Sequence, residues 1–301
     1  MANTRKISSE GRVFPVINGI IMSLILLTTL YPFWYCIVIS FNDGTDALKG
    51  GFYLFPRIFT WENYEFIFQN SRLLTGFRNS VLRTVSGTLL HIGFTGIVAY
   101  GLSKKQLHFR KAYMFFILLT MYFSGGMIPQ YLLIKNLGML DNFLVYIIPT
   151  MFGVYNAILF ISYYESIPES LEESATIDGA GKFVIFFRII IPCSIPIFAT
   201  IALFQIVSQW NSWFDTVIYT RSDTLVTLQS IMAKMVAEAD AAKEMNEMVA
   251  SGGGSSKAFV TIKPVTIRVA TMIVTTFPIT VAYPFLQKYF IKGIMLGSVK
   301  G

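Results

Sequence analysis

The chain has 301 residues, of which 54% are hydrophobic and 14% are charged, whereas charged residues make up about 25% of a typical soluble domain. This composition excludes a soluble globular protein and predicts an integral membrane protein. The net charge of +7 does not predict a nucleic-acid partner, because the basic residues flank apolar runs, as they do at membrane surfaces. Cys36 and Cys193 are expected to be free thiols, and the histidines have no metal-ligand spacing, so no metal site is expected.

Six apolar runs approach or exceed the roughly 20 residues that a helix needs to cross a bilayer. They cover residues 13–41, 77–102, 112–128, 143–164, 184–210 and 265–291. We therefore expect an all-α integral membrane protein with six transmembrane helices in one domain, 13–291, surrounded by membrane lipid. Polar tails at 1–12 and 292–301 flank this domain.

Lysine and arginine are distributed unequally between the two sides of the predicted helices. On one side, short flanks carry many of them: Arg5, Lys6, Arg12, Lys104, Lys105, Arg110, Lys111, Lys182, Lys288, Lys292 and Lys300. The short loop on the other side carries Lys135 alone. The positive-inside rule then predicts that both termini and the loop 167–183 are cytoplasmic, and that 42–75 and 211–263 face outward.

The loop 167–183 and the run after it read IPESLEESATIDGAGKFVIFFRIIIP, from Ile167 to Pro192. Pro168 suits the start of a helix, and glutamates in its first turns suit the helix dipole. Asp178-Gly179-Ala180-Gly181 then predicts the end of this short polar helix, and a second, apolar helix is expected from about Lys182.

This stretch resembles the EAA loop of binding-protein-dependent ABC importer permeases. The family pattern is Glu-Ala-Ala, three residues, Gly, nine residues, and Ile-x-Leu-Pro. This chain has matching residues at that spacing: Glu173, Ser174, Ala175, Gly179, Ile189, Ile191 and Pro192. Ser174 replaces an alanine and Ile191 replaces the leucine. The run Ile177-Asp178-Gly179-Ala180 has the form usual in the sugar-importing branch, and the C-terminus resembles that of the maltose-type inner permease.

The resemblance implies the type I ABC importer permease fold, in a bacterial plasma membrane. It implies a coupling helix that sits in a cleft of a cytoplasmic ATPase, where Glu173 pairs with a basic residue, Gly179 permits the turn and Ala175 packs. The implied coupling set is Glu173, Ser174, Ala175, Asp178, Gly179, Ala180 and Pro192. The alternative is a solvated acidic loop that caps a helix; Glu169 and Glu172 are interpreted in this way, as surface charges that offset the dipole.

The partners implied are a second homologous permease, a dimer of ATPase subunits and an extracytoplasmic solute-binding protein. The chain has no Gly-x-x-x-x-Gly-Lys-Ser/Thr sequence. We therefore expect no enzyme activity and no cofactor in this chain, with ATP and Mg²⁺ on the partner ATPase.

Polar residues within spans are candidates for a substrate path. They are Gln205, Gln209, Trp210 and Asn211, because amides and an aromatic ring suit sugar recognition. The alternative is an interfacial aromatic belt with amides that link helices, and the resemblance favours it. Arg83 and His91 are further candidates for the translocation path; the alternative, which is favoured, is a structural role in which neighbouring carbonyls satisfy them.

Residues 224–249 have apolar positions at helical spacing and predict an amphipathic outer helix. It either faces the solute-binding protein or packs on the spans as a lid. The resemblance implies that the chain imports a carbohydrate. The aromatic content of 15% and the long outer loop indicate a large sugar, an oligosaccharide of plant or algal origin. Alternatives are an ABC permease for peptide or phosphate, or a secondary transporter, which the near absence of Asp and Glu from the spans disfavours.

Overall fold

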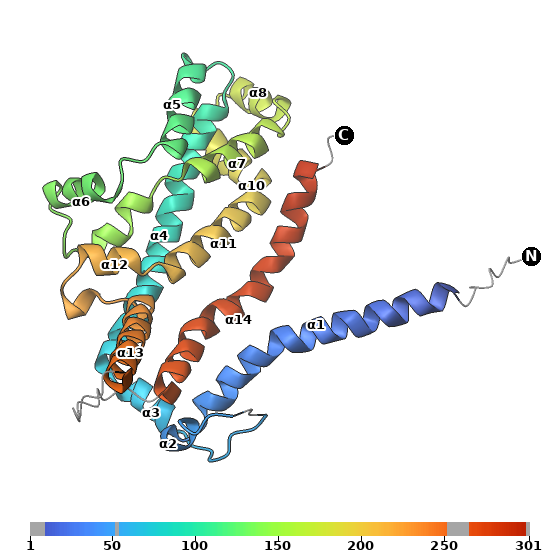
Figure 1. Cartoon of the computed structure of the whole chain (residues 1–301). Coiled ribbons are helices and arrows are strands. Elements are labelled where there is room, and N and C mark those ends of the chain that lie inside the picture. Colours follow the sequence, from blue (N-terminus) through green and yellow to red (C-terminus); the bar gives the residue numbers. More distant parts are fainter. Residues whose placement is uncertain (1–9, 52–53, 252–264, 299–301) are drawn as a thin grey trace, which may run out of the picture. The chain divides into compact units, whose positions relative to one another are not determined.

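The computed structural model describes the backbone of residues 10–51, 54–251 and 265–298, and the side chains of 14–51, 54–241 and 265–281. This part of the chain is helical, and its one β-type contact is an isolated bridge between Asn42 and Phe59 (Figure 1). The expected all-α class is confirmed. The chain divides into two compact units, Met1–Gln69 with Val236–Val274 and Asn70–Met235 with Thr275–Gly301, which we describe separately.

The first unit contains α1 (Glu10–Ser40), α2 (Gly44–Ala47) and α3 (Glu62–Gln69). Asn63 of α3 donates its side-chain amide to the backbone carbonyls of Ser40 and Asn42, at 2.9 and 3.0 Å. The rings of Phe41, Phe59 and Tyr64 pack around Trp61. The short helices expected within 42–75 are therefore present, and they satisfy the carbonyl groups at the end of α1.

The second unit is built around α4 (Ser71–Ser103), against which α7 (Val154–Glu165) and α11 (Ile195–Asn211) pack (Figure 1). Asn70 caps α4 by accepting from the N–H groups of Arg72 and Leu73, so the helix begins six residues before the expected span at 77. A buried apolar cluster joins these helices; it includes Ala99, Ala157, Phe160, Tyr164, Ile185, Ile190 and Ile201.

Three of the expected spans are bent or broken. α5 (Arg110–Tyr122) and α6 (Met127–Asn136) meet at 113°. The 3₁₀ turns η1 (Phe143–Tyr146) and η2 (Ile148–Thr150) meet α7 at 46°. The run Lys182–Cys193, which consists of α9 (Lys182–Ile185), the π turn η3 (Phe186–Ile190) and α10 (Ile191–Cys193), meets α11 at 82°.

The expected third span, 112–128, is wrong in its extent. α5 ends at Tyr122, because Ser124-Gly125-Gly126 are weak helix formers that interrupt the apolar run. α6 then turns away from α5 (Figure 1). Within the described residues, α1 and α4 are long and apolar enough to cross a membrane alone, and the three bent pairs bring the count up to five. A sixth span in α14 (Val265–Ser298), and hence the count of six, stays a prediction.

The polar segment after α11 is largely helical. It contains α12 (Phe214–Tyr219), the 3₁₀ turn η4 (Asp223–Leu225) and α13 (Leu228–Ser251), which confirms a helix within the expected 224–249; its place on the outer side stays a prediction. Asn79 donates its amide to the carbonyls of Thr224 and Val226, and Leu228 N–H donates to Ser80 Oγ. The start of α13 is thereby fixed to α4. Residues 1–9, 252–264 and 299–301 of the expected tails and outer loop lie outside the described residues.

A buried arginine joins α4, α11 and α12. The Arg83 side chain is 1% exposed, and its guanidinium contacts both carboxylate oxygens of Asp215, at 3.1 and 2.5 Å. It also donates to Gln209 Oε1, and its Cζ lies 4.6 Å from the ring centroid of Tyr146. Gly87 lies close beside this network: a Cβ there would be 2.6 Å from Gln209 Nε2, so a larger residue would displace the Gln209 side chain. Arg83 therefore has the structural role that the sequence analysis favoured.

Asp215→Asn is expected to lower the stability of the protein by about 3 kcal/mol, because it leaves the charge of Arg83 buried without its counter-ion. The measurement is the thermal unfolding of the purified protein in detergent. The matched control is Asp223→Asn, which removes the partner of Arg72 from an exposed ion pair and should change stability by less than about 1 kcal/mol. Equal losses of stability in the two variants would show that the buried ion pair contributes no more than the exposed one.

Candidate functional site

The polar helix predicted after residue 167 is α8 (Ser170–Ile177), near the end of α4 that is followed by α5 (Figure 1). Gly179 adopts φ +82°, and its N–H donates to Thr176 O at 3.0 Å, while Ala180 N–H donates to Ala175 O at 2.9 Å. These two bonds form a Schellman motif, which satisfies carbonyls at the helix end. No atom lies within 4 Å of a Cβ built on Gly179, so the turn requires glycine for its backbone conformation and not for space.

One face of α8 packs on the protein itself. Ala175 and Ala180, together with Ile167, lie against the apolar cluster formed by α4, α7 and η3. Ala175, which the resemblance assigned to packing at the coupling surface, is thus partly covered by its own chain, whereas Ser174 and Asp178 are exposed. Pro192 lies in α10, before the 82° bend, where it shapes the apolar helix.

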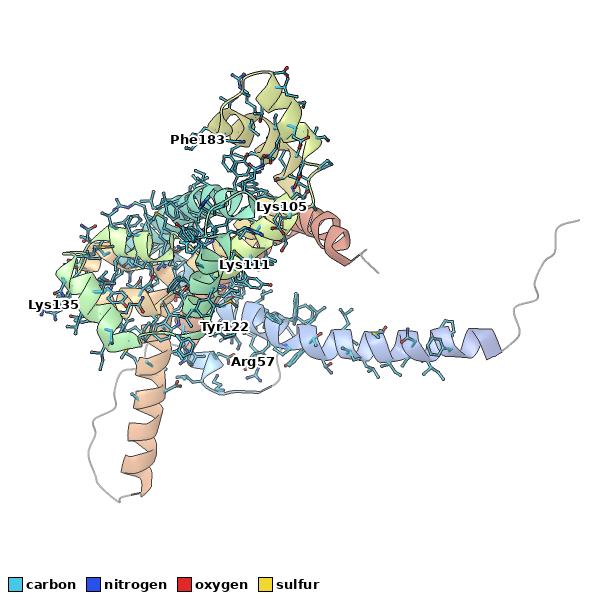
Figure 2. All side chains as sticks on the ribbon, turned by 90° about the horizontal axis from the view of Figure 1, so that it is seen from above. Arg57, Lys105, Lys111, Tyr122, Lys135 and Phe183 are labelled. Atoms are coloured by element: carbon cyan, nitrogen blue, oxygen red, sulfur yellow. The ribbon has the colours of Figure 1, made fainter. Side chains whose placement is uncertain are left out.

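The other face of the same segment is exposed and mixed in character. Ile177 and Phe183 are 86% and 70% exposed, and Figure 2 shows Phe183 on a part of the segment that projects beyond its neighbours. Glu173 is also exposed and has no ion-pair partner among the described residues. Asp178, also exposed, likewise has no ion pair among the described residues. An apolar surface with free carboxylates is suited to a partner that offers an apolar pocket beside a cation.

The remaining glutamates of this region form ion pairs within the chain. Glu165 pairs with Arg110, Glu169 with Lys105 and Glu172 with Lys104. Lys105 holds the pKa of Glu169 below its ordinary value, and the Glu169 carboxylate raises the pKa of Lys105. The interpretation of Glu169 and Glu172 as charges that offset the helix dipole missed these ion pairs. The basic run at 104–111, which the sequence placed on the same side of the membrane as these glutamates, could have indicated their partners.

The four substrate-path candidates are all in the second unit, but they do not converge on one opening. Gln209 donates to Thr150 Oγ1 at 2.7 Å in addition to accepting from Arg83. Trp210 Nε1 donates to Thr275 O at 3.0 Å, and Asn211 accepts from Gln229. The side chain of Gln205 is buried and has no hydrogen bond within the described part of the chain. The bonds of Gln209, Trp210 and Asn211 fit the alternative interpretation, in which they link helices.

A hollow of about 430 Å³ lies between α4, α11 and α14, with Trp210 in its wall. Thr84 and Thr88 also line it, and their buried hydroxyls have no partner among the described residues. The rest of the lining is apolar, so the hollow suits an apolar group with a polar contact on one side. No pattern in the sequence distinguished these threonines from those that bond to their own helix.

Residues 94–295 match the family described as "Binding-protein-dependent transport system inner membrane component". The polygalacturonan/rhamnogalacturonan transport system permease protein YtcP of Bacillus subtilis is 37% identical over 97% of this chain and 100% of its own. Protein LplC of the same species is 35% identical over 100% of this chain and 98% of its own.

A solved structure of a bacterial ABC transporter involved in the import of the acidic polysaccharide alginate contains a similar chain. Its TM-score is 0.83 and its identity is 29%, over 95% of this chain and 100% of that one. The EAA-like loop with its glycine turn, the helical fold and these relatives agree. The chain therefore belongs to the family of binding-protein-dependent transport system inner membrane components, which are transport permeases and not enzymes.

Proposed function

We propose that the chain is a membrane-spanning permease subunit of an ATP-driven carbohydrate importer. It forms half of the translocation path with a second homologous permease, and closure of an ATPase dimer moves α8 and drives alternating access. ATP and Mg²⁺ are held by the ATPase, and an extracytoplasmic solute-binding protein delivers the cargo. The observation that carries the proposal is the exposed face of α8, with a free Glu173, in a chain of this family.

In the proposed complex, α8 inserts into a cleft of the ATPase. Ile177 and Phe183 bury apolar surface there, and Glu173 meets a basic residue. The Schellman turn at Gly179 holds these side chains in place, and the family description supports a separate binding protein. The unequal distribution of lysine and arginine supports cytoplasmic termini and a cytoplasmic α8 in the plasma membrane.

The proposed cargo is an acidic oligosaccharide. Galacturonan, which YtcP is named for, and alginate, which the similar transporter imports, are both polymers of sugar acids. In the second unit, away from α8, the carboxylates of Asp141, Asp215 and Asp223 all have partners. Four cations there are exposed and have no ion pair within the described residues: Arg78, Lys135 (Figure 2), Arg221 and Lys234. This excess of positive charge favours an anionic cargo.

Glu173→Ala is expected to reduce the amount of ATPase that purifies with the tagged permease by at least about tenfold, because it removes a charge-assisted contact in a desolvated interface. The measurement is quantitative co-purification from membranes. Glu169→Ala is the matched control, since its carboxylate is exposed and pairs with Lys105 inside the chain. Retention of the ATPase by the Glu173 variant would remove this residue from the interface.

The Gly179 turn gives a graded test. Gly179→Asn should keep ATPase binding, because asparagine tolerates positive φ, whereas Gly179→Val should lose it because of strain of at least about 1–2 kcal/mol. Co-purified ATPase is again measured. Similar losses in both variants would mean that side-chain bulk, and not backbone conformation, decides the result.

The charge of the cargo is tested with trigalacturonate and its fully methyl-esterified form. With the cognate binding protein present, the acid is expected to stimulate ATP hydrolysis by the purified complex about tenfold or more above the neutral ester. Equal stimulation by both would contradict an acidic cargo, and stimulation only by peptide or phosphate would contradict a carbohydrate.

A further inference from the structure

Glu172 is the glutamate of α8 that reaches back to α4. Its carboxylate pairs with Lys104, and its Oε2 accepts from the Tyr100 hydroxyl at 3.2 Å. Lys104 Nζ in turn lies 4.0 Å from the centroid of the Tyr100 ring. Tyr100 lies in the last turn of α4 and Lys104 caps its C-terminus, so both contacts of the carboxylate belong to the same end of one helix.

The attachment point of Glu172 on α4 is rigid. Tyr100 is buried, and its ring packs at 5.0 Å from the ring of Phe186 in η3 and at 6.1 Å from that of Tyr164 in α7. The Glu172 side chain is 19% exposed and that of Lys104 is 32% exposed. By contrast, Lys105 and Glu169 are 75% and 69% exposed. An exposed pair of that kind contributes little, whereas a partly buried pair with a second hydrogen bond holds its geometry.

The covalent chain does not connect α8 directly to α4, because α8 is flanked in sequence by α7 and α9. A movement of α8 therefore reaches the end of α4 through packing, either the apolar contacts of Ala175 and its neighbours or the polar contacts of Glu172. Towards its other end, α4 carries Arg83, which joins α11 and α12. Arg83 and Lys104 are 21 positions apart, which corresponds to roughly 32 Å of helix.

We propose that Glu172 is a positioning residue that fastens α8 to the end of α4 through Lys104 and Tyr100, so that the two helices move as one body when a partner displaces α8. This inference rests on the proposed function, because it assigns the displacement to ATPase closure. Glu173 and Glu172 thus have separate tasks on neighbouring positions: one contacts the partner, and the other transmits the movement within the chain.

The test measures the distance between spin labels at Thr176→Cys on α8 and Leu74→Cys on α4, with Cys36 and Cys193 replaced by serine. The full complex with its ATPase is studied with and without a non-hydrolysable ATP analogue. In the otherwise unchanged chain, the distance distribution should stay the same when nucleotide binds. In Glu172→Ala the distribution should shift or broaden by about twofold or more on nucleotide binding, since α8 then moves without α4.

The charge-swapped variant Lys104→Glu/Glu172→Lys should restore the narrow distribution, which a general structural defect would not do. Lys105→Ala, which breaks the exposed pair, should behave as the unchanged chain. If Glu172→Ala does not assemble, Glu172→Gln retains the side-chain volume and takes its place. A nucleotide-dependent shift in the unchanged chain, an unaffected distribution in the assembled Glu172 variant, or a failed swap would each overturn the proposal.

The two proposals fail in different ways. If no ATPase purifies with the unchanged chain, the proposed function is wrong, whatever the distances show. If the ATPase is present and binds nucleotide but the label distances do not depend on residue 172, the importer assignment stands and the role of Glu172 is wrong.

Discussion

A guanidinium that is 1% exposed remains charged inside an apolar bundle only if its hydrogen bonds are satisfied. Asp215, Gln209 and the ring of Tyr146 meet this requirement for Arg83, and in doing so they fix α4 to α11 and α12. The other end of α4 is fixed to α8 through Glu172. α4 (Ser71–Ser103) therefore has a charged attachment in its first half, at Arg83, and another at its C-terminal end, at Lys104, which suits a part that transmits movement.

Polar groups of the second unit fall into two classes. Most are satisfied within the chain, such as Gln209 and His91, whose ring contacts Thr150 O and Asn156. Others are exposed without an ion pair among the described residues, and Glu173 on α8 is one of them. The first class maintains the fold, whereas the second class is available to other proteins or to cargo. In the proposed function, Glu173 contacts the ATPase, and the exposed cations of the second unit that lie away from α8 attract an anionic sugar.

The parts that the sequence predicted depend on local rules. The helix α8 and its end at Gly179 follow from glutamates, glycine and spacing within one short stretch, and α13 follows from its apolar periodicity. The break at 123–126 was missed because apolar residues on both sides of Ser124-Gly125-Gly126 were interpreted as one span. The Lys104–Glu172 pair joins residues 68 positions apart, and the Arg83–Asp215 pair joins residues 132 apart. No single-sequence rule specifies such partners, so the contacts of Glu172 and Gln209 became clear only in three dimensions.

We propose that this permease works in an ATP-driven importer. The most direct measurement is the uptake of labelled trigalacturonate by proteoliposomes that contain the chain, its partner permease and the ATPase, with the binding protein outside. Accumulation is expected to require ATP inside the vesicles and the binding protein outside. Accumulation that follows an ion gradient and is independent of ATP would contradict it and favour a secondary transporter.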